Sequence, residues 1–106
     1  MSEAKLVVLY PQPTDQVQFE KDYAEEHIPL MQAKMKGMKA VVTKLLATPA
    51  GPPEYFYMAE IFAPSIDAIK AFLATPDGQE VAANAGKISS GGPPTVIFAE
   101  ENTHHL

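Results

Sequence analysis

Four short stretches of the chain carry the pattern of hydrophobic residues that is typical of β-strands. They cover residues 4–10, 39–48, 54–63 and 95–100, and each is rich in β-branched or aromatic side chains. Loops rich in proline and glycine, such as PAGPP, break the pattern between them. Because the second and third stretches are joined by so short a loop, we expect them to pair antiparallel.

The alternation in residues 54–63 assigns side chains to the two faces of a strand. One face should carry Phe56, Met58, Glu60 and Phe62, and the other Tyr55, Tyr57, Ala59 and Ile61. Glu60 places a charge in the middle of a strand, so it is either a catalytic carboxylate or one member of an ion pair with a neighbouring strand. We favour an ion pair of this glutamate with Lys5, Lys39 or Lys44.

A helix is expected between the first two strands, and Thr14 or Asp15 can cap its start. Its apolar residues recur three or four positions apart and so share one face: Phe19, Tyr23, His27 and Leu30 or Met31. Pro29 cannot donate a backbone hydrogen bond, and its ring disfavours the α conformation at Ile28. The sequence therefore predicts a kink, or a restart with Pro29 in the first turn, and a helix end near Gly37.

Two further helices are expected between the third and fourth strands. Ser65 can cap a helix that runs to about Ala74. Thr75 and Pro76 then form a second start signal, for a short helix that ends at about Ala85. The order of elements along residues 1–106 is β-α-β-β-α-β, which predicts a single α+β domain of ferredoxin-like fold, with a four-stranded antiparallel sheet.

The predicted strands are apolar on both faces, whereas the helices of this fold lie on one side and can cover only one face of the sheet. A second copy of the same sheet is the simplest cover for the other face. We therefore predict a homodimer in which two sheets pack face to face about a two-fold axis.

Composition narrows the classes of function. The chain has a net charge of −5 and no cysteine, which argues against nucleic-acid binding, disulfides and cysteine-ligated metals. We see neither a signal peptide nor an apolar run long enough for a membrane span, so we expect a cytoplasmic protein without a membrane partner. We expect no metal site. His104 and His105 lie at the end of the chain, and whether they are native or an added tag stays open.

Two segments resemble the EthD family, which is named for an ethyl tert-butyl ether degradation protein. The segment FEKDYAEEHIPLM is similar to the family pattern of Phe, Tyr, His and Pro-Leu at fixed offsets, with Phe19, Tyr23, His27, Pro29 and Leu30 in place. Residues 62–85 resemble a second family segment that contains Pro-Glu-Gly-Gln, here PDGQ. The chain departs from the family where an Asp is common, because Asn84 stands there, and where Ile88 replaces a Phe.

The resemblance implies the dimeric α/β-barrel superfamily, whose members include cofactor-free monooxygenases, cyclases, isomerases and haem enzymes. It favours a small cofactor-independent enzyme or accessory enzyme that acts on an apolar or aromatic small molecule. The alternative is a non-catalytic protein that holds a hydrophobic ligand or supports an oxygenase system. Fold alone does not choose between them.

His27 is the candidate acid/base and Tyr23 the candidate hydrogen-bond donor. The candidate substrate-binding residues are Phe19, Leu30, Met31, Tyr57 and Phe62. For His27 a structural role is also open, in which the ring bonds a backbone carbonyl that Pro29 leaves free. The aromatic residues can equally belong to the core or to the dimer interface.

Overall fold

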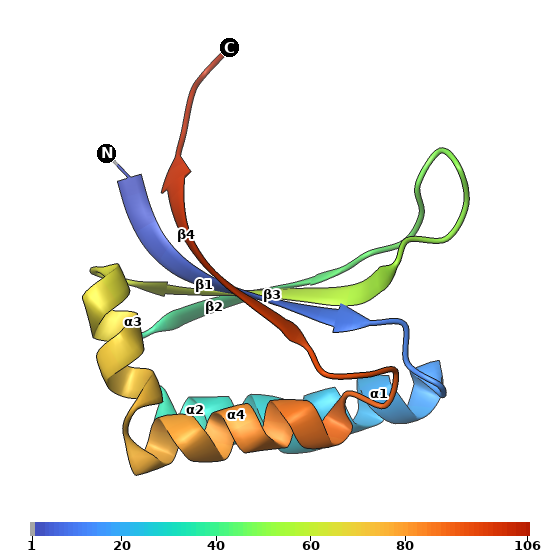
Figure 1. Ribbon diagram of the computed structural model, residues 1–106, viewed down its shortest axis with the longest axis horizontal. Helices are drawn as coiled ribbons and strands as arrows, with labels where there is room; N and C mark the ends of the chain where they lie inside the picture. Colours follow the sequence, from blue (N-terminus) through green and yellow to red (C-terminus); the bar gives the residue numbers. More distant parts are fainter. Residues whose placement is uncertain (1) are drawn as a thin grey trace.

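A computed structural model describes residues 2–106 and has the predicted order of elements. These are β1 (Ser2–Pro11), α1 (Gln16–Asp22), a π-helical segment η1 (Tyr23–His27), α2 (Ile28–Lys34), β2 (Lys39–Lys44), β3 (Tyr55–Ala63), α3 (Ile66–Leu73), α4 (Pro76–Ile88) and β4 (Thr95–Asn102). The strands form one antiparallel sheet in the order β2-β3-β1-β4 (Figure 1). This arrangement confirms the α+β, ferredoxin-like prediction.

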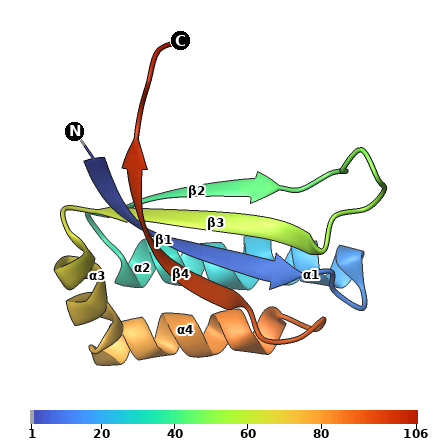
Figure 2. The same ribbon diagram turned by 45° about the horizontal axis from the view of Figure 1, so that its top comes forward.

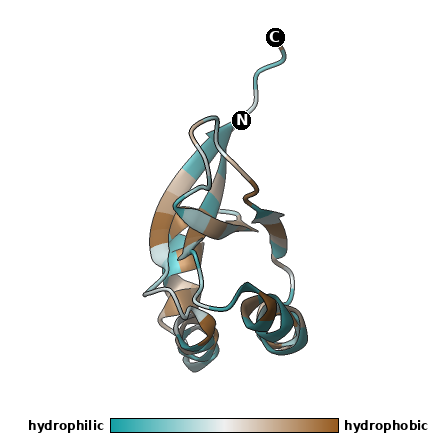
Figure 3. Ribbon diagram, turned by 90° about the vertical axis from the view of Figure 1, so that its right-hand side faces the viewer, coloured by the Kyte–Doolittle hydropathy of each residue, from teal (hydrophilic) through white to brown (hydrophobic). Residues whose placement is uncertain are grey.

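The helices lie on one face of the sheet. Figure 2 shows α1, α2 and α4 beneath the strands, with α3 at one end of this layer. Figure 3 looks along the helices and shows apolar segments on both layers. We call the sheet face toward the helices the inner face; on β1 it carries Ala4, Leu6, Val8 and Tyr10, all of which are buried. The opposite, outer face has no helix over it among residues 2–106.

The predicted helix starts are confirmed by their hydrogen bonds. The side chains of Asp15, Ser65 and Thr75 each accept a bond from a backbone N–H three residues later, at 3.0 Å in all three cases. These bonds satisfy donors that the first helical turn would otherwise leave free. α4 runs three residues further than expected, to Ile88.

The backbone around Pro29 differs from the prediction. Ile28 keeps the α conformation, with φ −61° and ψ −48°, and its N–H donates to the carbonyl of Tyr23, five residues earlier. This π turn shifts the hydrogen-bond register just before Pro29, so the chain stays helical through the proline. The restart is confirmed, since Pro29 lies in the first turn of α2. α2 ends at Lys34, and Gly37 takes a left-handed φ of 87° in the following turn.

β3 departs from simple alternation at its first residues. Tyr10 pairs with Tyr57 but Pro11 pairs with Tyr55, which leaves Phe56 as the extra residue of a β-bulge. Phe56 is therefore buried on the helix side, with its ring 5.8 Å from that of Phe19, and does not share a face with Met58 as predicted. β2 is also shorter than expected and ends at Lys44.

The outer face carries an ion-paired cluster. The Lys5 ammonium donates to the Glu60 carboxylate and, at 2.9 Å, to Glu101 on β4. The predicted pairing of Glu60 with a lysine on a neighbouring strand is thus confirmed. Beside this cluster the Lys39 ammonium lies 4.4 Å from the centre of the Phe62 ring, a cation–π contact.

Candidate active site

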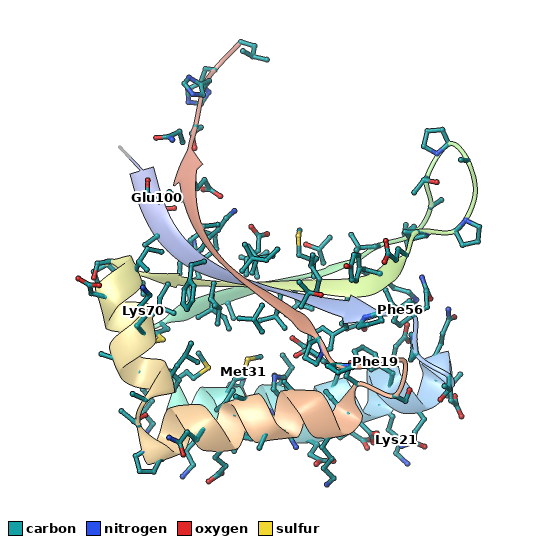
Figure 4. All side chains as sticks on the ribbon, in the orientation of Figure 1. Phe19, Lys21, Met31, Phe56, Lys70 and Glu100 are labelled. Atoms are coloured by element: carbon teal, nitrogen blue, oxygen red, sulfur yellow. The ribbon has the colours of Figure 1, made fainter. Side chains whose placement is uncertain are left out.

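A cavity of about 290 Å³ lies between the inner face of the sheet and the helices. Most of its wall is apolar and comes from both layers: Leu6, Val8, Met31, Met35, Ala59, Ile61, Phe72, Leu73, Val81, Ala82, Ala85, Pro94 and Val96. Figure 4 shows Met31 directed from α2 toward the sheet. The remaining wall residues are Tyr10, His27 and Gln79, so no described wall residue carries a permanent charge.

His27 is the ionisable imidazole in this wall. It is 3% exposed, and its Nδ1 lies 2.8 Å from Oδ1 of Asn84 on α4. Burial lowers the pKa of His27 below its ordinary 6.5, and the Asn84 bond and the charge of Glu26 offset this only in part. The lowered pKa favours the neutral ring at pH 7.

The partner of His27 differs from the one that the structural interpretation expected. The ring bonds a side chain on another helix, whereas the structural interpretation expected a backbone carbonyl freed by Pro29. Sequence reasoning noted Asn84 only as a departure from the family pattern. It lies 57 positions from His27 in sequence, and no local pattern brings the two together.

Tyr23 lies next to His27 but outside the cavity wall. Its ring centre is 5.1 Å from that of His27, and the side chain is 2% exposed. Its hydroxyl is the one buried side-chain polar atom between residues 2 and 106 without a hydrogen-bond partner. Burial raises the pKa of the Tyr23 phenol. The cavity wall contains Tyr10, and not Tyr23. The Tyr10 ring packs edge-on against Tyr23 at 5.6 Å, and no sequence pattern indicated that it lies at the site.

The structure divides the predicted substrate-binding residues into separate groups. Met31 lines the cavity. Phe19 and Tyr57 pack edge-on at 5.0 Å in an aromatic cluster with Tyr23, next to the cavity but not in its wall.

Two of these residues lie elsewhere. Leu30 faces a surface groove between α2 and α4, which it shares with Glu26, Asn84 and Lys87. Phe62 is on the outer face of β3. It pairs with the outer-face residue Lys5, whereas its neighbour Ile61 pairs with Leu6 and points inward. Neither side chain can touch a ligand in the cavity, which corrects both predictions for this site.

A second, partly polar pocket of about 390 Å³, with Gln32 and Lys36 in its wall, lies under the β2 edge of the sheet. Met31, Met35 and Ile61 line both cavities. Because methionine side chains are unbranched and flexible, this shared wall can adjust to ligands of different length.

In the described part of the chain, no three His, Asp or Glu side chains come together in a way that could hold a metal ion. Of its helices, none combines the length and the apolar character that crossing a bilayer requires.

Comparison with known proteins supplies the family. The model of the EthD domain matches residues 11–91, most of the chain. The chain belongs to the EthD family. A Rhodococcus erythropolis relative, described as an uncharacterized 11.0 kDa protein in the thcB-thcC intergenic region, is 30% identical over 99 residues, which span 93% of this chain and 95% of the relative.

Solved structures agree with the family. An EthD family protein from Bacillus halodurans superposes with a TM-score of 0.84 at 28% identity, over 94% of this chain and 99% of that one. A dimeric ferredoxin-like protein of unknown function from Thermobifida fusca has a TM-score of 0.60 at 13% identity, over 96% and 92% of the two chains. At that identity the second match supports the fold alone.

Proposed function

We propose that this EthD protein binds a small, neutral, apolar compound in the 290 Å³ cavity and that His27 acts on it as a general base. The observation that carries this proposal is a buried, neutral imidazole, tethered at Nδ1, in a cavity without permanently charged walls. The volume is at the small end for ligand sites, which favours compounds of one or two rings.

The chemistry that suits such a site is removal of a weakly acidic proton. Nε2 of His27 would take a proton from a phenol O–H or from a C–H next to a carbonyl, which leaves a phenolate or enolate and an imidazolium. The Asn84 amide oxygen accepts the Nδ1–H bond in both states. Apolar walls exclude water, so the new anion and cation would interact strongly.

The Tyr10 side chain would stabilise the phenolate or enolate that forms. Tyr10 is part of the wall and would donate to the developing oxyanion. The Tyr23 hydroxyl, which has no partner in the structure, would act by donating to the Tyr10 hydroxyl as Tyr10 donates to the oxyanion, and not by direct contact with the ligand.

The test measures proton exchange directly. Flat cyclic aromatic ketones are incubated with the protein in D₂O, and deuterium uptake next to the carbonyl is followed by NMR, with binding measured separately by calorimetry. Wild type should accelerate uptake, whereas His27→Gln should bind with similar affinity and lose about 10²- to 10⁴-fold of the acceleration. The double variant His104→Gln/His105→Gln, which changes exposed residues of the tail, is the matched control.

Two results would redirect the proposal. Binding with no acceleration in either protein would make the chain a carrier of a hydrophobic ligand, the alternative function. Equal acceleration by wild type and His27→Gln would remove His27 from the chemistry.

We also infer that two copies pair through the outer faces of their sheets. That face carries apolar residues from all four strands, namely Val7 and Leu9 on β1, Val41 on β2, Met58 and Phe62 on β3, and Ile97 on β4. Val41 and Ile97 are 40% and 43% exposed in the single chain. A sheet-to-sheet contact would remove this surface from water, and the Thermobifida fusca protein of the same fold is described as dimeric.

A further inference from the structure

The imidazole of His27 is the first member of a chain of hydrogen bonds that leads out of the cavity to the surface. Its Nδ1 lies 2.8 Å from Asn84 Oδ1, and Asn84 Nδ2 donates to Glu26 Oε1 at 2.8 Å. The Lys87 ammonium also donates to Glu26 Oε1, at 2.9 Å. Asn84 is thus held at both ends, by the histidine on one side and by an ion pair on the other.

The direction of each bond in this chain follows from chemistry. An ionised carboxylate can only accept hydrogen bonds, so the end of the Asn84 amide that faces Glu26 must be its NH₂ group. The Lys87 ammonium keeps Glu26 ionised, and together with the Asn84 bond it lowers the pKa of the Glu26 carboxyl. The amide oxygen of Asn84 must then face His27, and an oxygen there requires a hydrogen on Nδ1.

The other ring nitrogen is consequently bare. In a neutral imidazole one nitrogen carries hydrogen and the other is an acceptor. Nε2 has no hydrogen-bond partner in the described chain. Among the side-chain polar atoms of residues 2–106 that lack a partner, Tyr23 Oη alone is fully enclosed. Nε2 is therefore not fully enclosed, and it belongs to a residue that lines the cavity.

We propose that Glu26 and Lys87 are positioning residues, which orient the Asn84 amide and thereby hold His27 in the Nδ1–H tautomer with Nε2 free to accept a proton. The role of this tautomer in catalysis rests on the proposed function, whereas the assignment of the tautomer does not. Glu26 and Lys87 are not part of the cavity wall and lie at the surface groove between α2 and α4.

The proposal distinguishes two opposite chemistries at one ring. If the Asn84 amide turned over, its NH₂ group would face Nδ1, which would have to be an acceptor, and Nε2 would carry the hydrogen. His27 would then present a donor to the cavity in place of a base. In the described chain it is the Glu26 carboxylate that excludes this arrangement, because it cannot donate to the amide oxygen.

The test reads the tautomer by NMR on protein labelled with ¹⁵N in its histidine rings, at pH 7.5. Wild type should show His27 with a protonated Nδ1 and a bare Nε2. In Glu26→Gln the amide that replaces the carboxylate can donate or accept, so a second signal set with hydrogen on Nε2 should appear. His104 and His105 provide signals from rings outside the site.

Two further variants separate positioning from a general structural effect. Glu80→Gln makes the same change in the same groove, and Glu80 has no hydrogen bond to Asn84, so it should leave the tautomer unchanged. Asn84→Asp in the Glu26→Gln background, read at a pH above the ring pKa that the new carboxylate raises, should restore the Nδ1–H form, since a carboxylate at position 84 accepts from Nδ1 without help from Glu26.

Deuterium uptake provides a second readout. If Glu26→Gln leaves half of the rings in each form, the exchange rate should fall about twofold with unchanged ligand affinity. The inference is overturned if wild type carries hydrogen on Nε2, or if Glu26→Gln folds and keeps the wild-type tautomer. Loss of the proposed function would look different, as a correct tautomer in a protein that accelerates no exchange.

Discussion

Removal of the Tyr23 hydroxyl should stabilise the protein. The hydroxyl is buried with no hydrogen-bond partner, whereas the ring packs edge-on or tilted against Tyr10, His27 and Tyr57 at centre distances of 5.6, 5.1 and 5.1 Å. Tyr23→Phe keeps the ring and its contacts and removes only the unsatisfied group. Most substitutions of a buried residue destabilise, so the expected sign is itself diagnostic.

The magnitude follows from the cost of leaving a buried polar group unpaired, which is about 1–3 kcal/mol. Part of this gain is lost, because the missing oxygen leaves a small void whose neighbours lose contacts. We therefore expect a net increase of about 1 kcal/mol in the free energy of unfolding. For a domain near this size that corresponds to a rise in Tm of about 4 °C.

The assay is reversible denaturation by urea, with thermal unfolding as a second probe. Tyr57→Phe is the matched control, because this hydroxyl belongs to a half-buried residue of the same aromatic cluster, and the change should stay within about 0.5 kcal/mol. A loss of 1 kcal/mol or more in Tyr23→Phe would refute the reasoning, since it would mean that the hydroxyl has a partner in the folded protein.

The same variant also connects stability with function. A buried hydroxyl without a partner is rare in folded proteins and usually has a reason to persist. If Tyr23 supports Tyr10 during proton transfer, Tyr23→Phe should be more stable and slower in deuterium uptake. This combination is the usual trade-off at active sites.

Two further predictions concern pH and assembly. The folded-state pKa of His27 lies below its ordinary 6.5, so the free energy of unfolding should fall as the pH is lowered through about 6.5. The lowered pKa of Glu26 changes stability only below its ordinary 4.5 and so does not interfere. Urea unfolding should show this decline in wild type but not in His27→Gln. A wild type decline equal to that of His27→Gln would contradict this. Light scattering should give twice the 11.5 kDa chain mass for wild type, but the mass of one chain for Ile97→Lys. The control Val17→Lys, which changes an exposed residue of α1 away from the sheet, should stay dimeric. A monomeric wild type would exclude the sheet-face dimer.

Local chemistry predicted most of the fold. Strand patterns, the loop prolines and the capping side chains of Asp15, Ser65 and Thr75 act over a few residues; the structure has all four strands, β2 shorter than expected, and the three caps where expected. Two of the errors arose where one extra residue changes the register. The π turn before Pro29 keeps Ile28 helical, and the bulge in β3 turns Phe56 inward.

The site was harder to predict, because it depends on contacts between distant segments. Helical spacing correctly put Tyr23 and His27 side by side, and it put Met31 on the same side. It could not reveal that Asn84 meets His27 across the helix layer, or that Tyr10 forms the wall in front of Tyr23. Phe62 was misplaced for a related reason, since one strand pattern cannot tell which face the helices cover.

The asparagine at position 84 suits the proposed role of His27 as a base. An aspartate there would place a negative charge beside the ring, raise the pKa of His27 and favour the imidazolium, which cannot accept a proton. Asn84 accepts the same Nδ1–H bond without a charge, and burial then keeps the pKa low. The negative charge is one hydrogen bond further out, on Glu26, which pairs with Lys87 at the surface. From there it can fix the direction of the amide and still help an imidazolium that forms during the reaction, without charging the ring beforehand.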